Sequence, residues 1–199
     1  MATDEELLLA WRGGDNTAGD QLIARYFDPI CRFFRSKLGD DVEDLIQRTF
    51  FDCLESKQRI HAPSFRSWLF GVARHRLFDH LRRSLARGGD EDLGARSLTD
   101  LRTRPSERVA RAQTREIVAR AMQTLPLDFQ IVLELAYWED LDGPEIAAVL
   151  GIGANTVRSR LARGRAGLRE ALRTAALDPA ELAAGLAALP RGAVEESTG

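Results

Sequence analysis

The chain has 199 residues and a formal net charge of −2 at pH 7, and 44% of its residues are apolar. This length and composition allow one large or two small domains with packed cores. The sequence lacks an apolar run of about eighteen residues and opens with the acidic stretch MATDEELLLAW, so we expect neither a membrane-spanning helix nor a signal peptide. A soluble, cytoplasmic protein is therefore predicted.

Apolar residues recur with helical spacing along nearly the whole chain. No stretch of useful length shows the alternation of apolar and polar residues that is typical of a strand. Thr3 with Glu6 has the pattern of a capping box, which predicts a first helix that stops at the glycine pair after Arg12. A second helix is expected over residues 17–38, interrupted at Pro29 because proline lacks the N–H donor.

The next predicted helix is capped by Asp40, with Glu43 three residues further on, and its buried and exposed sides differ clearly. The buried side is expected to comprise Val42, Leu45 or Ile46, Phe50 and Leu54. Polar residues three or four apart form an exposed stripe on the other side. The exposed residues are Asp41, Asp44, Gln47 and Arg48.

A further helix is predicted from Phe65 to Arg83, after a break at Pro63-Ser64, and its polar side is unusually basic. Its buried side is expected to comprise Phe65, Trp68, Leu69, Val72 and Ala73. An aromatic pair such as Phe65 and Trp68 belongs to a core more often than to a stacking surface. We therefore assign Trp68 mainly a structural role.

Composition changes over residues 84–106, which are rich in Gly, Arg, Asp, Ser and Thr and lack an apolar stripe. This predicts a flexible linker. Helical periodicity resumes over residues 107–125 and continues from Asp128 to Trp138. The predicted fold is all-α, with two small helical domains, residues 1–83 and 107–173, joined by the linker.

A C-terminal extension follows the second domain and is predicted to contain a short helix opening at Asp178-Pro179, then a disordered tail. This helix could bind a partner, but passive capping of a domain is the favoured interpretation. Cys31 and Cys53 lie in helical, apolar surroundings without metal-ligand spacing, so they are expected to be buried core thiols, with redox sensing as the alternative.

Residues 141–168 read LDGPEIAAVLGIGANTVRSRLARGRAGL and predict a helix-turn-helix. The first helix opens at Pro144, and Gly151 ends it as a C′ glycine. The second begins near Ala154 or Asn155. Its spacing places four small or apolar residues on one face. These residues are Val157, Leu161, Gly164 and Leu168.

The other faces of this second helix are rich in arginine, which suits phosphates and guanine edges in the DNA major groove. We therefore interpret it as a recognition helix, the alternative being a merely solvated arginine face. The expected DNA-binding residues are Asn155, Thr156, Arg158, Ser159, Arg160, Arg163 and Arg165. Because the whole chain is weakly acidic, tight DNA binding is expected to need a partner.

Four motifs together resemble the extracytoplasmic-function sigma factors, the two-domain initiation subunits of bacterial RNA polymerase. They are DVEDLIQRTFFDCL, SFRSWLFGVARHRLFDHLRR, the LP pair at 125 and 126, and EIAAVLGI followed by TVRSRLARGRAGLR. The resemblance spans residues 5–173, and the motifs of both domains occur in the order and at the separation typical of the family.

The resemblance implies three contact surfaces, of which the first is the helix from Asn155, which would recognise the −35 element. The helix from Asp41 to Leu54 would dock on the clamp helices of the polymerase β′ subunit through Asp41, Asp44, Gln47 and Arg48. The helix from Phe65 would bind the −10 element and hold an unstacked base. Phosphate contacts are expected from Arg66, Arg74, Arg76, Arg82 and Arg83. His75 and Asp79, one turn apart, would supply polar groups for a base edge or for each other.

The sequence departs from the family pattern at several positions that bear on promoter preference. His75 stands where the family often has asparagine, and Gly143-Pro144 and Gly153-Ala154-Asn155 replace the commoner residues of the helix-turn-helix. The family also implies binding to the β subunit and to an anti-sigma protein. The linker, with its Asp90-Glu91-Asp92 run, would thread toward the RNA exit path.

Two other classes of function are alternatives to a sigma factor. A free-standing transcriptional regulator would bind DNA tightly without polymerase. An enzyme acting on DNA, such as a recombinase, would need paired carboxylates or a Ser/Arg cluster, which the sequence does not show, and His61, His75 and His80 lack metal spacing. No catalytic residue, metal or cofactor is therefore expected.

Overall fold

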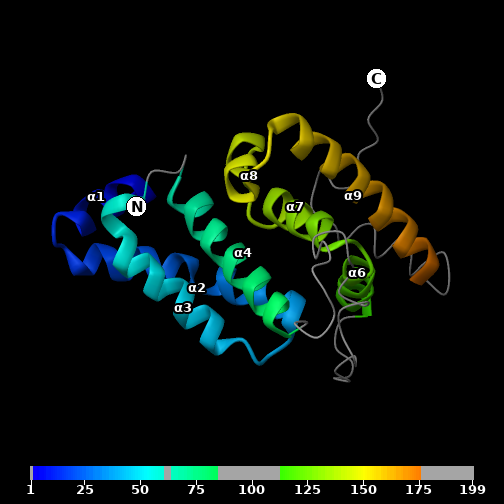
Figure 1. Ribbon diagram of the computed structural model, residues 1–199, viewed down its shortest axis with the longest axis horizontal. Helices are drawn as coiled ribbons and strands as arrows, with labels where there is room; N and C mark the ends of the chain where they lie inside the picture. Colours follow the sequence, from blue (N-terminus) through cyan, green and yellow to red (C-terminus); the bar gives the residue numbers. More distant parts are fainter. Residues whose placement is uncertain (1, 61–63, 85–112, 176–199) are drawn as a thin grey trace. The chain divides into compact units, whose positions relative to one another are not determined.

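The computed structural model describes residues 2–60, 64–84 and 113–175 (Figure 1). Over these ranges the secondary structure is helical and includes no strand, as predicted. The described residues form two compact units, one of residues 2–60, 64–84 and Pro144–Ile152, and the other of residues 113–143 and 153–175. Among the described residues, no helix is both long and apolar enough to cross a membrane.

The first helix, α1 (Asp4–Arg12), begins at the predicted capping box. The Thr3 hydroxyl accepts the Glu6 N–H at 3.2 Å, and the Glu6 carboxylate accepts the Thr3 N–H at 2.8 Å. Both bonds satisfy N–H groups that a helix start otherwise leaves unpaired. The helix ends before the glycine pair, also as predicted.

Helix α2 (Asn16–Leu38) is continuous, so the predicted interruption at Pro29 is wrong. Asp15 caps it, since its Oδ1 atom accepts the N–H groups of Thr17 and Ala18 at 2.9 and 3.2 Å. Buried residues lie on both sides of the proline within the same core. They include Leu22, Tyr26, Ile30, Phe33 and Phe34. Their burial outweighs the local cost of one missing helical hydrogen bond.

Helix α3 (Glu43–Ser56) corrects two expectations about this segment. Asp40 does not cap it: Val42 occupies the N-cap position without a side-chain hydrogen bond, and the Asp40 carbonyl instead accepts the Val42 N–H at 3.0 Å. Leu54 is 47% exposed, and Cys53 is buried in its place. The buried face runs through Ile46, Thr49, Phe50 and Cys53, at helical spacings that leave Leu54 outside.

A 3₁₀ turn (Lys57–Arg59) and helix α4 (Phe65–Ser84) complete the four-helix part of the first unit. The Ser64 hydroxyl accepts the Ser67 N–H at 3.1 Å at the start of α4. Phe65, Leu69 and Ala73 are buried as predicted, whereas Trp68 and Val72 are half-buried. The core of the unit also receives Phe70, Leu77 and Leu81 from α4.

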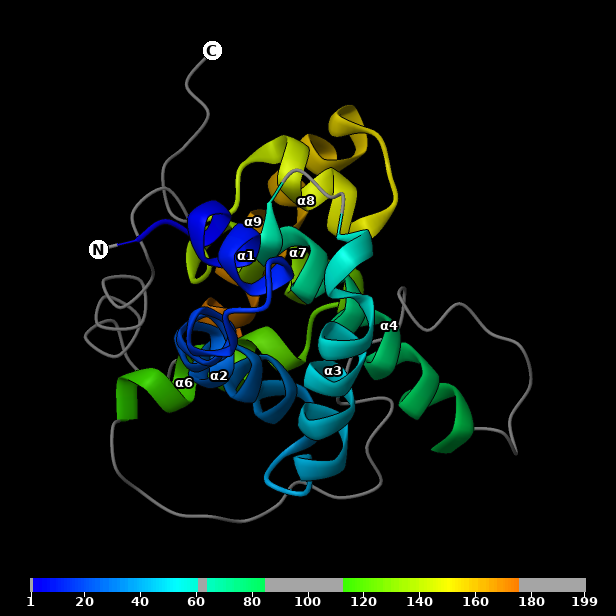
Figure 2. The same cartoon turned by 90° about the vertical axis from the view of Figure 1, so that its left-hand side faces the viewer.

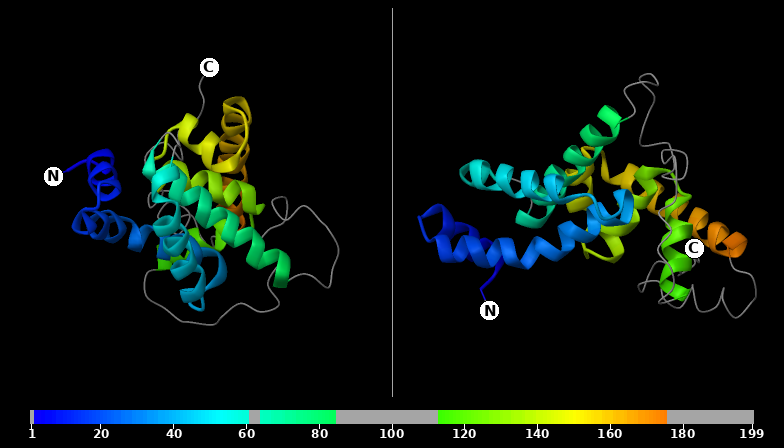
Figure 3. Two further views of the ribbon diagram at one scale, coloured as in Figure 1. Left: turned by 60° about the vertical axis from the view of Figure 1, so that its left-hand side comes forward. Right: turned by 90° about the horizontal axis from the view of Figure 1, so that it is seen from below.

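Neighbouring helices of this unit pack in pairs. Figure 3 shows α1 folding back beside the first part of α2, and Figure 2 shows α3 beside α4. Gly19 permits the first approach, because a Cβ at that position would lie 2.5 Å from Trp11 Cδ1. Cys31 and Cys53 are buried free thiols, which confirms that expectation, and burial raises the pKa of Cys53 to about 12.

The second unit consists of α6 (Gln113–Gln123), α7 (Leu127–Tyr137) and α9 (Ala154–Ala175). Helix α7 lies one residue from its predicted bounds and is mostly buried. It meets α9 closely, since a Cβ at Gly164 would lie 3.2 Å from Leu133 Cγ. Of the predicted α9 seam, Val157, Gly164 and Leu168 are buried and Leu161 is half-buried.

Helix α8 (Gly143–Leu150) precedes α9 in the sequence and ends as predicted. Gly151 has a φ of +66°, the left-handed conformation of a C′ glycine, and the Ile152 N–H bonds the Ala147 carbonyl at 3.1 Å. Helix α9 then begins at Ala154, one of the two positions predicted for its start. The predicted linker, the start of the helix expected from residue 107 and the helix expected at Asp178 lie outside the described residues.

Candidate nucleic-acid interface

The outer face of α9 carries five of the seven side chains predicted to read DNA. Asn155, Thr156, Arg158 and Arg163 are exposed, and Ser159 is half-buried. Arg158 Nη1 donates to Asn155 Oδ1 at 3.4 Å, and Arg163 donates to the Ser159 hydroxyl from Nη2 at 2.6 Å. Each arginine thus donates a hydrogen bond to a polar residue of its own helix and remains exposed.

The other two predicted residues of α9 point toward α7. Arg160 Nη2 lies 2.7 Å from Asp128 Oδ2, and Arg165 Nη1 lies 3.4 Å from the Tyr137 hydroxyl. Sequence reasoning missed Asp128 and Tyr137 as partners. Helical periodicity shows which residues share a face of one helix, but not which side chains of a neighbouring helix contact that face. The arginines of α9 therefore fall into two groups with different surroundings.

Helix α4 carries the residues predicted to act at the −10 element. His75 Nε2 lies 3.3 Å from Asp79 Oδ2, and Arg82 Nη1 lies 3.0 Å from Asp79 Oδ1. His75 remains 76% exposed despite this contact. The Arg74 guanidinium lies 4.6 Å from the centroid of the Phe78 ring, within cation–π distance. Arg82 and Arg83 are exposed near the end of the helix.

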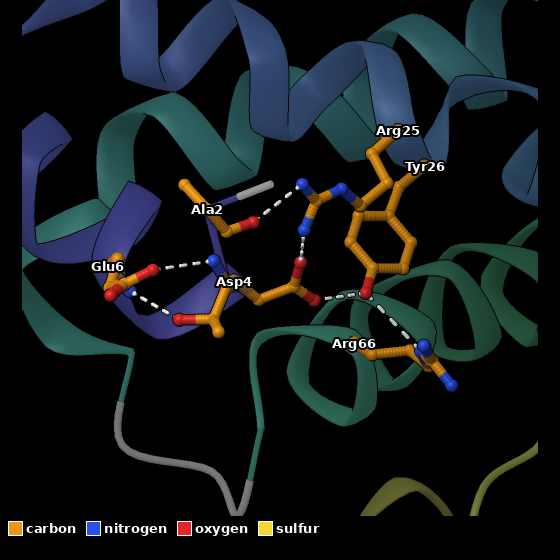
Figure 4. A network of polar contacts seen from close by, with 7 residues as sticks. Ala2, Asp4, Glu6, Arg25, Tyr26 and Arg66 are labelled. Atoms are coloured by element: carbon orange, nitrogen blue, oxygen red, sulfur yellow. Dashed lines mark hydrogen bonds and ion pairs between the residues drawn. The ribbon is translucent and has the colours of Figure 1, made fainter.

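Arg66 begins the basic side of α4 and belongs to the polar network of Figure 4. Its Nε donates to the Tyr26 hydroxyl at 3.3 Å. That hydroxyl donates to Asp4, which also pairs with Arg25. Burial, followed by the hydrogen bond to Asp4, raises the pKa of Tyr26 to about 12. The network ties α1, α2 and α4 together, a connection the sequence pattern did not indicate.

Arg76 lies on the side of α4 that faces α3. It donates to both carboxylate oxygens of Asp52, from Nε at 2.7 Å and from Nη2 at 2.6 Å. Both side chains are about a quarter exposed. This forked geometry is the strong form of an arginine–carboxylate pair, so Arg76 joins the two helices.

The outer face of α3, together with Asp41 just before the helix, exposes all four residues predicted to bind polymerase. Arg48 Nε lies 2.9 Å from Asp44 Oδ1, and Asp41 and Gln47 are also exposed. The same face continues beyond Gln47 to Phe51 and Leu54, which are 57% and 47% exposed. We call these exposed residues, together with the predicted four, the α3 outer face. The doubled phenylalanine at positions 50 and 51 was a signal that one aromatic ring would lie outside.

Comparison with known proteins connects these helices to transcription. The sigma-70 region 2 profile matches residues 22–87, and the sigma-70 region 4 profile matches residues 115–168. The ECF RNA polymerase sigma factor SigM of Mycobacterium tuberculosis (strain ATCC 25618 / H37Rv) is 32% identical over 178 residues, covering 85% of each chain. The chain belongs to the ECF sigma factors of RNA polymerase.

Other relatives of this sigma factor agree with the assignment. RNA polymerase sigma factor HrpL of Pseudomonas syringae pv. syringae is 31% identical over 155 residues, which is 75% of this chain and 84% of the relative. The structure of CnrH in complex with the cytosolic domain of CnrY matches with a TM-score of 0.62 and 25% identity, over 86% of this chain and 97% of that chain.

A second solved structure shares the fold of this sigma factor. RpoE from Bartonella quintana, in complex with the anti-sigma factor NepR, matches with a TM-score of 0.61 and 20% identity over 77% of this chain and 96% of that chain. The resemblance and the all-α fold predicted from the sequence are confirmed. The sigma factor is a transcription initiation factor that acts with RNA polymerase core on promoter DNA, and a free-standing regulator is not favoured.

Proposed function

We propose that this sigma factor divides promoter recognition between α9, which reads the −35 element, and α4, which opens the −10 element, while the α3 outer face binds the β′ subunit. The corresponding domains are residues 1–83 and 107–173, joined by a linker over 84–106. The protein contributes recognition and positioning in the cytoplasm, and core polymerase, including its β subunit, supplies the chemistry.

The observation that carries the −35 assignment is the two-sided character of α9. Val157 and Leu168 are buried, whereas Arg158 and Arg163 reach solvent on other faces of the same helix. The helix begins with exposed Asn155 and Thr156, and the N-terminal residues of a recognition helix are the ones that meet base edges in the major groove. Guanidinium groups at these positions suit guanine edges and phosphates.

The −10 assignment rests on the exposed polar side of α4. Arg82 and Arg83 supply charge for the phosphate backbone, and Arg74 adds a guanidinium packed on an aromatic ring. His75 with Asp79 presents a polar pair to solvent, suited to the edge of an unstacked base. Arg66 and Arg76 lie on the same helix with side chains tied to Tyr26 and Asp52, so we propose that they approach phosphates while also holding α4 in place.

The polymerase assignment rests on the α3 outer face. Mixed charge from Asp44 and Arg48 borders exposed Phe51 and Leu54, so polar and apolar groups are combined in one surface. Protein interfaces typically have an apolar centre with a polar rim. We also propose an anti-sigma protein as a partner, because the solved relatives CnrH and RpoE are bound to CnrY and to the anti-sigma factor NepR.

Run-off transcription with core polymerase tests this division. Arg158→Ala or Arg163→Ala should weaken transcription from a −35-dependent promoter and leave core binding unchanged. If the arginine contacts a base, its loss should cost about 1 to 3 kcal/mol of promoter-binding free energy. Asp44→Ala and Gln47→Ala should lower affinity for core polymerase instead. The assignment of surfaces would be wrong if the α9 variants lost core binding, or if both α3 variants bound core normally.

A further inference from the structure

The ion pair between Asp128 and Arg160 separates one arginine of α9 from its neighbours. On a helix, Arg160 follows Val157 by three residues and precedes Gly164 by four, so the three share one side. Val157 and Gly164 are both buried, and a Cβ at Gly164 would lie 3.2 Å from Leu133 Cγ of α7. Arg160 therefore emerges beside the α7–α9 contact, whereas Arg158 and Arg163 emerge on other sides.

Asp128 is unusually dependent on this partner. It lies in the first turn of α7, and its side chain is 15% exposed. Its Oδ2 atom lies 2.7 Å from Arg160 Nη2. Its Oδ1 atom is buried and has no hydrogen-bond partner within the described part of the chain. A carboxylate shielded in this way holds the arginine firmly, because losing the pair would leave a buried charge unmatched.

We propose that Arg160 is a positioning residue of the −35 interface: its ion pair with Asp128 fixes the beginning of α9 against α7, and its guanidinium does not contact DNA. The inference rests on the proposed reading of the −35 element by α9. The pair acts within the first two turns of α9, where Asn155, Arg158 and Ser159 lie, whereas the close contacts at Gly164 and Gly167 come later along the helix. The Asp128–Arg160 ion pair therefore sets the direction of the first two turns of α9.

The salt dependence of promoter binding separates positioning from DNA contact. Each phosphate contact contributes about −0.9 to the slope of log K against log salt concentration. Holoenzyme assembled from core polymerase and the full chain is titrated with promoter DNA over a range of salt concentrations. We expect Arg160→Ala to lower affinity about tenfold, because the beginning of α9 is no longer fixed against α7, without changing the slope. Arg158→Ala or Arg163→Ala should weaken binding, and a residue contacting phosphate should reduce the slope by about one.

Two further variants test the pair itself. Asp128→Asn keeps the shape of the side chain but removes its charge, so it should lower promoter affinity as Arg160→Ala does, and the double variant should be no worse than either single one. Arg160→Lys should restore most of the affinity, because lysine keeps the charge beside Asp128. Glu170→Gln, which breaks the exposed Arg173–Glu170 contact of the same helix, is the matched control and should bind normally.

The outcomes are distinguishable. A slope reduced by about one in Arg160→Ala, or normal promoter affinity in Asp128→Asn, would overturn the positioning role while leaving the −35 assignment intact. Normal binding by both Arg158→Ala and Arg163→Ala would instead overturn the −35 assignment on which the inference rests. If Asp128→Asn unfolds, judged by circular dichroism, the comparison of Arg160→Lys with Arg160→Ala decides: equal losses in both would contradict the ion-pair role.

Discussion

Asp52 of α3 and Arg76 of α4 form a forked ion pair in which both carboxylate oxygens accept a guanidinium N–H. The pair is about a quarter exposed, so solvent screens it less than it screens surface pairs. We expect Asp52→Ala or Arg76→Ala to lower the free energy of unfolding by about 1 to 3 kcal/mol, measured by urea denaturation.

The exposed Arg48–Asp44 pair of the same unit is the matched control for that measurement. Its side chains are 50% and 68% exposed, and they lie one turn apart on a single helix. Asp44→Ala should therefore cost at most about 0.5 kcal/mol of unfolding free energy. Equal losses for Asp44→Ala and Asp52→Ala would show that the forked pair adds nothing to stability.

Gly19 should be intolerant of even the smallest side chain. An added Cβ would lie 2.5 Å from Trp11 Cδ1, and Trp11 is itself buried. Gly19→Ala should therefore destabilise the protein by about 1 to 3 kcal/mol through overpacking, although alanine favours helices. Gly71→Ala in α4 is the control, because beyond its own helix backbone no described residue lies within 4 Å of its added Cβ. Thermal unfolding should show this variant to be neutral or up to about 1 kcal/mol more stable.

Gly151 is expected to matter through its backbone alone. Its φ of +66° is the left-handed conformation, and apart from its chain neighbours no described residue lies within 4 Å of an added Cβ. Gly151→Ala should cost about 1 kcal/mol in the free energy of unfolding, and Gly151→Asn should cost less, because asparagine tolerates this conformation better. Gly153→Ala, which has open space and no left-handed φ, serves as the reference; a loss as large there would contradict the backbone explanation.

Stability at high pH should depend on Tyr26. Its pKa is raised from 10.0 to about 12 in the folded protein, so the unfolded chain releases this proton first as the pH rises. The contribution of the neutral phenol to stability is complete below pH 10 and is lost as the pH rises toward 12. Urea denaturation across this range should show the decline, and Tyr26→Phe should flatten it.

A direct titration can assign that effect. The chain has two tyrosines, so tyrosinate absorbance of Tyr26→Phe reports the remaining Tyr137, and the difference from the parent protein reports Tyr26. The prediction fails if the difference curve has its midpoint near 10, the ordinary value for tyrosine.

Local signals in the sequence predicted much of the fold. The Thr3–Glu6 capping box, the break at Ser64 and the glycine at 151 each act within a few residues, and each marks a helix boundary in the structure. The prediction that failed at Pro29 depended on contacts distant in sequence. Pro29 stays within α2 because residues on both sides are buried in one core, a condition that no local propensity reports.

The candidate site also has features that the sequence predicted and features that it could not predict. Periodicity identified which arginines of α9 avoid the buried seam, and Arg158 and Arg163 are indeed exposed. It could not show that Arg160 meets Asp128 or that Arg76 meets Asp52, because these partners lie on other helices. The amino-acid composition does not distinguish one arginine from another, whereas in the folded protein some arginines contact other protein residues.

The shared core of α3 and α4 also has a consequence for genetics. Cys53 of one helix and Leu69 of the other are fully buried in a single unit, so a change at such positions disturbs both outer surfaces together. A selection for alleles that lose promoter opening but retain polymerase association should therefore recover solvent-facing positions such as His75, while core alleles should lose both activities at once. The distribution of recovered alleles would trace the boundary between the two surfaces.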